Sequence, residues 1–135
     1  LSERCRRANA IYSATGKKAI LVSIHCNAAG SGDSWMKAKG WSVFVSNNAS
    51  GNSKKLADCL AQAAECIPVS VRKPMPGQLY WQQNLAICRD SNCPAILTEN
   101  FFQDNKDDVE YLLSREGKDA VARIHIEGVA KYLGL

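Results

Sequence analysis

The stretch AILVSIHCNAAGSG, residues 19–32, joins an apolar run to a polar turn. Residues 19–24 are mostly apolar and of strand length, which predicts a buried strand in a sheet covered by helices on both faces. His25 follows this run directly, ahead of a small loop that contains glycine. An imidazole at the end of a buried strand either packs against a neighbouring loop through a hydrogen bond or serves a chemical role.

The rest of the chain alternates predicted helices and strands. Helices are expected over residues 2–14, 53–67, 105–113 and 114–133, with N-caps from Ser2, Ser53, Asn105 or Asp107, and Ser114. Strands are expected over residues 19–24, 41–46 and 95–99, with a short helical or extended piece within 81–88. This alternation predicts one α/β domain with a twisted, mostly parallel sheet flanked by helices on both faces.

The composition favours a single folded domain and argues against a nucleic-acid-binding or membrane-spanning protein. The chain has 135 residues, 46% of them hydrophobic and 22% charged, which suits a single domain with a real core. The net charge is +4, and no basic stripe is interleaved with aromatic residues, so nucleic acid is not an expected partner. The apolar runs are only about strand length, so no transmembrane segment is expected.

The six cysteines contain no C-x-x-C pair, which argues against a structural zinc finger. The favoured interpretation is that they are free thiols used as small buried apolar groups. A disulfide between Cys88 and Cys93, which flank a short loop, is the alternative in an oxidising compartment.

Two polar side chains follow two different apolar strands. His25 comes after residues 19–24, and Glu99 comes after the run AILT. Ligands of such sheets bind at the carboxyl ends of the strands, so both side chains are expected on one rim. A carboxylate beside a buried strand needs a partner, which a metal, an arginine or a catalytic water would supply. A neutral imidazole and a carboxylate together are parts of a hydrolytic metal site.

Other candidates carry weaker signals. His125, in the last predicted helix, is interpreted as a structural histidine, and Cys26 is expected on the sheet face opposite His25. Asn27 either holds the loop through its own backbone or binds a substrate amide. Trp35 and Trp81 fall in predicted loop regions and are candidates to line a cleft.

The motifs LVSIHCNAAG (residues 21–30) and PAILTENFFQDN (94–105) resemble those of a known enzyme family. The chain is similar to the zinc-dependent N-acetylmuramoyl-L-alanine amidases of amidase-3 type, which occur in bacterial cell walls and phage endolysins. Four further segments resemble segments of the same family and occur in the same order along the chain: LSERCRRAN, GWSVFVS, SKKLADCLAQAA and GKDAVARIHIEGVAKYLGL. The resemblance implies a phosphorylase/hydrolase-like α/β fold with a sheet of about six strands.

The resemblance also implies a reaction. One Zn²⁺ is expected, with cleavage of the amide between the lactyl group of N-acetylmuramic acid and L-alanine in peptidoglycan. By position, His25 matches the zinc-binding histidine and Glu99 the general base and acid. Zinc polarises the carbonyl and activates water, and Glu99 moves the proton. The implied partner is the peptidoglycan stem peptide, and the implied location is the cell envelope or, for a phage protein, release to the wall.

One departure from the family stands out. The family takes a further zinc-binding histidine and glutamate from a segment that precedes LSERCRRAN, and neither Asp33 nor His125 matches them in position. Residues 1–135 are therefore expected to form an amidase catalytic domain without its N-terminal strand and helix. The alternatives are a metal-free remnant that only binds peptidoglycan and a related zinc peptidase or deacylase. An uncovered strand edge also predicts self-association.

Overall fold

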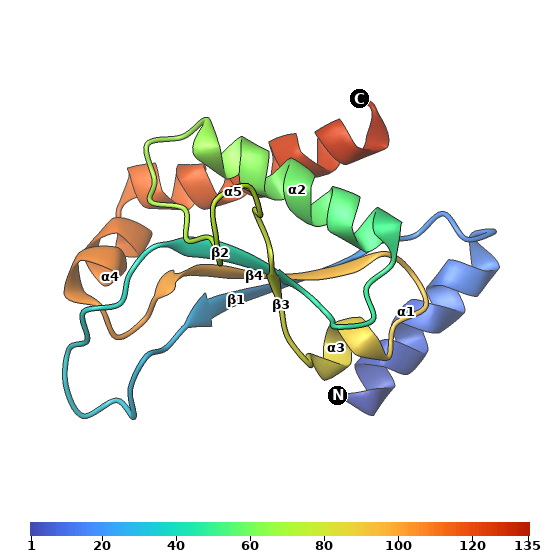
Figure 1. The fold of residues 1–135 in the computed structure, drawn as a ribbon, viewed down its shortest axis with the longest axis horizontal. Coiled ribbons are helices and arrows are strands. Elements are labelled where there is room, and N and C mark those ends of the chain that lie inside the picture. The colour runs from blue at the N-terminus through green and yellow to red at the C-terminus, as the bar shows by residue number, and fades with distance from the viewer.

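The computed structural model describes residues 1–135, which form one mixed four-stranded sheet and five helices (Figure 1). In chain order the elements are α1 (Ser2–Ala14), β1 (Leu21–Asn27), β2 (Trp41–Val45), α2 (Gly51–Glu65), β3 (Trp81–Gln82), α3 (Ala86–Arg89), β4 (Ala95–Phe102), α4 (Lys106–Leu113) and α5 (Arg115–Leu133). The predicted α/β class is confirmed.

The strands lie in the order β1-β4-β2-β3. β1 pairs with β4 and β2 with β3 in parallel, whereas β2 runs antiparallel to β4. A parallel return needs a crossover, usually a helix, and residues 28–40 contain none, so β2 runs back against the direction of β1. The sheet is thus mixed, with four strands rather than about six.

One face of the sheet packs against α2 and α5, which lie side by side across it in Figure 1. Its core consists of alternate residues of β2 and β4 and the apolar stripe of α2, including Trp41, Val43, Val45, Ile96, Leu56 and Leu60. α5 approaches α2 closely at Gly128, where an added Cβ would lie 2.6 Å from Leu60 Cγ and 2.7 Å from its Cα. Burial of this face provides the main hydrophobic stabilisation of the fold.

The opposite face is covered only in part. α1 and α3 pack against the start of β1 and β4 through a small cluster of Cys5, Ile87, Cys88, Ala95 and Leu97. The pleat places Leu97 and Glu99 on the same face of β4. The cluster ends at Leu97, so the cover stops just before the position of Glu99. This partial cover sets the place of the site.

Several predicted boundaries shift. β1 begins at Leu21 and continues through Asn27, and β4 continues to Phe102. Both strands run further than predicted because they remain paired with each other beyond His25 and Glu99. The N-cap of α2 is Ser50, whose side chain accepts a hydrogen bond from Ser53 N, and α1 begins at Ser2 with Leu1 as its cap residue. The predicted caps Ser53 and Ser2 were therefore wrong, whereas Asn105 and Ser114 cap α4 and α5 as predicted.

β1 is an edge strand of the sheet, and the helical cover of its two faces is incomplete towards its carboxyl end. Ile24 is 61% exposed, and its side chain borders an apolar groove between β1 and α5. The groove is lined by Ile24, Leu112, Lys118, Val121, Ala122, His125 and Ile126.

No helix combines the length and the apolar composition that a bilayer crossing requires. All six cysteines are free thiols, four of them buried. Burial and the neighbouring Cys5 and Cys93 raise the pKa of the Cys88 thiol to about 12, which keeps it protonated at neutral pH.

Candidate active site

His25 and Glu99 are register partners on adjacent parallel strands. Directly paired residues on neighbouring strands project to the same face of a sheet. The two side chains predicted to share a rim therefore lie next to each other, on the face that α1 and α3 leave open. Both residues lie within their strands rather than after them, as a result of the longer β1 and β4.

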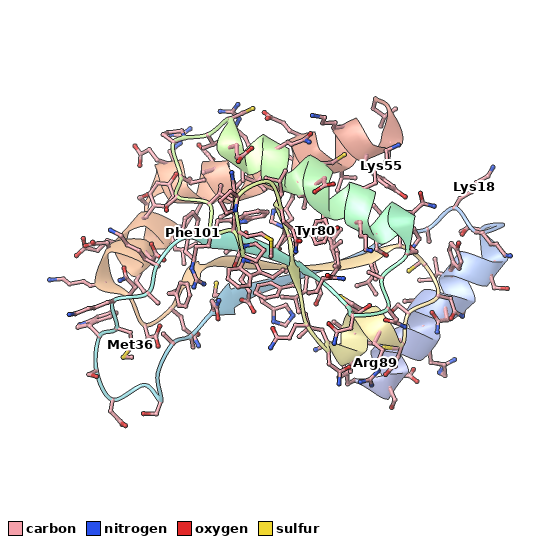
Figure 2. All side chains as sticks on the ribbon, viewed as in Figure 1. Lys18, Met36, Lys55, Tyr80, Arg89 and Phe101 are labelled. Carbon is pink, nitrogen blue, oxygen red and sulfur yellow. The ribbon has the colours of Figure 1, made fainter.

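A β-bulge follows this pair. His25 pairs with Glu99 but Asn27 pairs with Phe102, so β4 contains one extra residue. Phe101 has a left-handed backbone (φ 66°) and packs edge-on against the ring of Tyr111, with 5.3 Å between centroids. Bulges occur beside active sites, where they re-aim side chains and end a ladder. Here the bulge turns Phe101, labelled in Figure 2, into the core next to the site.

Glu99 is half-buried, and its Oε2 atom is buried without any hydrogen-bond partner. Burial raises the pKa of this carboxyl above its ordinary value, because the low-dielectric surroundings disfavour the charged form. An unpartnered carboxylate with a raised pKa is suited to accept and return a proton near neutral pH.

His25 is exposed, and its Nε2 lies 2.8 Å from Ser23 Oγ on the same face of β1. When Nε2 donates in this hydrogen bond, Nδ1 keeps a free lone pair. Such an outer partner is the usual way in which a metal-binding histidine is oriented. Asn27 holds the turn, since its Oδ1 accepts from Ala28 N at 2.9 Å, and a role for it in binding substrate stays a prediction.

Asn100 is a supporting residue that sequence reasoning missed. Its side chain is 2% exposed and links three strands. Its Nδ2 donates to the backbone carbonyl of His25 at 3.0 Å and to Thr98 Oγ1 at 3.1 Å, and its Oδ1 accepts from Trp41 Nε1 at 2.8 Å. The available signal was an amide directly before two phenylalanines, because an amide that is buried must find its hydrogen bonds inside the protein.

His125 is structural, as interpreted from the sequence. Its Nδ1 lies 2.7 Å from the carbonyl of Val121 and its Nε2 lies 2.9 Å from Thr98 Oγ1. Since the carbonyl can only accept, Nδ1 is the donor and Nε2 accepts from the threonine. Burial lowers the pKa of the ring, so it is neutral at physiological pH.

Two aspartates fix the loop 28–40 beside the site, and neither was recognised from the sequence. Asp104 Oδ2 accepts from Ala29 N and Gly30 N, both at 2.8 Å. Asp108 Oδ2 accepts from Gly40 N and Phe102 N, both at 2.9 Å. These bonds tie the loop after β1 to the loop after β4. Trp35 lies on this loop, 61% exposed.

The imidazole nitrogen of His25 and the carboxylate oxygens of Glu99 are atoms of the kind that coordinate zinc. Residues 1–135 contain no group of three histidine, cysteine, aspartate or glutamate side chains that could hold a metal ion. Cys26, Asp33 and His125 do not form such a group with the pair.

Comparison with known proteins identifies the family. The family model for N-acetylmuramoyl-L-alanine amidases of amidase-3 type matches residues 1–131. The chain belongs to this family. Over all 135 residues it is 30% identical to the endolysin of Bacillus phage SPP1, of which it spans 46%.

Solved amidase structures share the fold. The N-acetylmuramoyl-L-alanine amidase of Clostridium difficile 630 aligns with 98% of this amidase-3 chain at a TM-score of 0.80 and 28% identity. Ami1 of Mycobacterium smegmatis gives the same TM-score and coverage at 20% identity, which shows the fold alone. The chain spans 64% and 59% of these two proteins and about half of the phage endolysin.

Proposed function

We propose that residues 1–135 are the part of a peptidoglycan amidase that carries its proton-transferring glutamate and one zinc ligand. The bond cut is the amide between N-acetylmuramic acid and L-alanine, in the bacterial cell wall. The observation that carries the proposal is the pairing of His25 with Glu99 on adjacent parallel strands, on the open face of the sheet. Membership of the amidase-3 family supports the substrate.

The residues present fit zinc in kind. The His25 imidazole is exposed and oriented by Ser23, and Glu99 beside it has a buried oxygen without a partner. His25 would hold the ion, and further ligands would come from outside residues 1–135, since a catalytic zinc usually takes three protein ligands. Zn²⁺, when bound, supplies a Lewis acid that polarises the scissile carbonyl and acidifies water.

Glu99 performs the proton transfers. Its ionised carboxylate takes a proton from the attacking water and delivers it to the departing nitrogen of L-alanine, which leaves as the amine. The raised pKa suits both halves of this task, because the protonated form must also be populated. Asn100 holds the backbone of His25 in place opposite Glu99, and so fixes the spacing of the pair.

A second candidate is a protein that binds peptidoglycan without cutting it. The observation in its favour is the lack, within residues 1–135, of a third side chain that could complete a metal site. A related zinc peptidase would use the same two side chains on a different amide. Activity on defined substrates separates the three.

The test is Glu99→Gln in the full-length protein, with Glu110→Gln on the exposed side of α4 as the matched control. We expect Glu99→Gln to keep zinc and fold while the release of stem peptide from purified peptidoglycan falls about 10²–10⁴-fold, the usual effect of losing a general base. The control should keep full activity. Near-normal release by Glu99→Gln would refute the role assigned to this residue.

A further inference from the structure

Three buried side-chain oxygen atoms in residues 1–135 have no hydrogen-bond partner: Ser42 Oγ, Glu99 Oε2 and Asp104 Oδ1. Two of the three belong to residues that lie opposite each other, because Ser42 and Glu99 are register partners on the antiparallel strands β2 and β4. A buried polar atom without a partner is costly and rare. Two such atoms on directly paired residues therefore point to each other as the missing partner.

Both side chains project to the face of the sheet on which His25 lies. Glu99 pairs with His25 on one side and with Ser42 on the other, and directly paired residues on neighbouring strands point to the same face. The three residues form one row across β1, β4 and β2, and Figure 1 shows these strands together in the sheet. Ser42 is fully buried, Glu99 half-buried and His25 exposed, so the row opens from β2 towards β1.

The surroundings of the two oxygen atoms supply no other partner. The neighbours on the same face at the amino end of β4 and the carboxyl end of β2, Leu97 and Phe44, belong to or pack against the apolar cluster under α1 and α3. Arg72 lies on the segment that bridges to the start of β2, and its guanidinium stacks over the ring of Phe102, 4.9 Å from the centroid. The guanidinium donates to neither oxygen atom.

We propose that the Ser42 hydroxyl holds the Glu99 carboxyl through a hydrogen bond to Oε2, and so positions the proton-transferring group of the site. The positioning role rests on the proposed function, whereas the bond itself does not. The Cβ atoms of directly opposed residues on antiparallel strands lie about 4.5–5.5 Å apart. Rotation about the side-chain torsions of serine and glutamate closes the remaining gap between the two oxygen atoms, without movement of the backbone.

A hydroxyl suits this place because it serves both protonation states of the carboxyl. It donates to an ionised carboxylate, and it turns to accept from a protonated one. With Oε2 held from the side of β2, Oε1 of Glu99 is left to take the proton from water and return it. The last torsion of glutamate has no sharp preference, so the carboxyl plane turns freely without this bond. Ser42 acts through Glu99 and is a positioning residue.

The first experiment measures the hydrogen bond without turnover, by thermal unfolding of the 135-residue chain at pH 7 followed by circular dichroism. Ser42→Ala should lower Tm by about 3–5 °C, because it leaves the enclosed Oε2 without a donor. The same change in a Glu99→Met chain should leave Tm unchanged or raise it, because the hydroxyl then has no partner to lose. A rise in Tm in the parent chain, or an equal fall in both chains, would overturn the proposal.

Threonine and valine at this position form a matched pair, because they share size and shape and differ in the hydroxyl. Strain from the added methyl groups is common to both variants. Ser42→Thr should therefore have a higher Tm than Ser42→Val in the parent chain, and this difference should disappear in the Glu99→Met chain. The control is Ser46→Ala, at a buried serine directly after β2 whose Oγ donates to Asn48 Oδ1. It should change Tm equally in both chains.

The second experiment measures turnover of a soluble muramoyl peptide by the full-length protein. Ser42→Ala should lower kcat about tenfold, the scale of one hydrogen bond to a charged group, with KM and zinc content unchanged. Ser42→Thr should keep a higher kcat than Ser42→Val, and Ser46→Ala should keep full kcat. An unchanged kcat in Ser42→Ala, or a loss that appears in KM alone, would overturn the positioning role.

The two experiments separate this proposal from the amidase itself. The Tm comparison decides the hydrogen bond even for a protein that does not cut peptidoglycan, because it needs no substrate. A full-length protein that cuts peptidoglycan while Ser42→Ala raises the Tm of the chain would overturn the role of Ser42 alone.

Discussion

Replacing Asn100 with leucine should destabilise the chain and loosen the pairing that builds the site. Leucine has the same number and branching of side-chain heavy atoms as asparagine, so the change removes hydrogen bonds without creating a cavity. The fully buried Trp41 Nε1 loses its acceptor, and the carbonyl of His25 and the hydroxyl of Thr98 each lose a donor. Thr98 keeps its bond to His125, so its loss is small.

The magnitude follows from the partners left behind. A buried donor without an acceptor costs about 1–3 kcal/mol, and the partly buried carbonyl adds about 1 kcal/mol. We therefore expect a loss of about 2–4 kcal/mol in the free energy of unfolding. With an unfolding entropy of about 2.1 cal/mol/K per residue, 3 kcal/mol corresponds to a fall in Tm of ~10 °C for this chain.

The assay is thermal unfolding of the 135-residue chain followed by circular dichroism and tryptophan fluorescence. Asn52→Leu, at an exposed position on α2, is the matched control and should shift Tm by no more than ~2 °C. Hydrogen exchange at the amides of β1 should rise in Asn100→Leu because its tie to β1 is lost. A Tm within 2 °C of the parent chain would show that Asn100 does not hold the three strands together.

Three further predictions concern the pair and the strand edge. Because burial raises the pKa of Glu99 in the fold, the chain loses stability as pH rises from the unfolded-state pKa, near 4.5, through the folded-state pKa. Glu99→Gln should therefore raise Tm at pH 7 but not at pH 4, and an equal gain at both values would contradict this. His25→Ala in the full-length protein should lower zinc content by atomic absorption, whereas stoichiometric zinc would make His25 structural. The 135-residue chain alone should lose zinc to a mild chelator, show no amidase activity, and self-associate in analytical ultracentrifugation through the β1 edge, with Ile24→Lys restoring the monomer. Retained one-to-one zinc with turnover, or a monomeric parent chain, would contradict this prediction.

The elements of the fold were predictable where one local pattern decides them. α5 begins after Ser114 and α4 after Asn105 because a capping side chain must satisfy the first free amides, and that requirement is visible in the sequence. The order of the strands, β1-β4-β2-β3, was not predictable, because it depends on pairings between distant segments. The apolar run before His25 does not reveal that an open groove separates Ile24 from α5.

The proximity of His25 and Glu99 was predictable from the sequence, whereas the residues that support the pair were not. His25 and Glu99 stand out because a polar side chain directly after a buried apolar strand requires a hydrogen-bonding or ionic partner. The supporting residues Asn100, Asp104 and Asp108 form hydrogen bonds to backbone atoms of residues more than 50 positions away. Asp108 also binds the backbone of Phe102 at the end of β4. Hydrogen bonds of this kind produce no periodic pattern in the sequence. Only the fold brings these partners together.

The parallel pairing of β1 with β4 also determines when the site can form during folding. His25 and Glu99 are 74 positions apart, and their strands meet only after the intervening chain has folded into β2 and α2 or has closed a long loop. Contacts of such long sequence separation form late, because the entropy of loop closure comes first. A partly folded chain with α2 packed on α5 can therefore look well ordered to helix-sensitive probes before His25 and Glu99 have met.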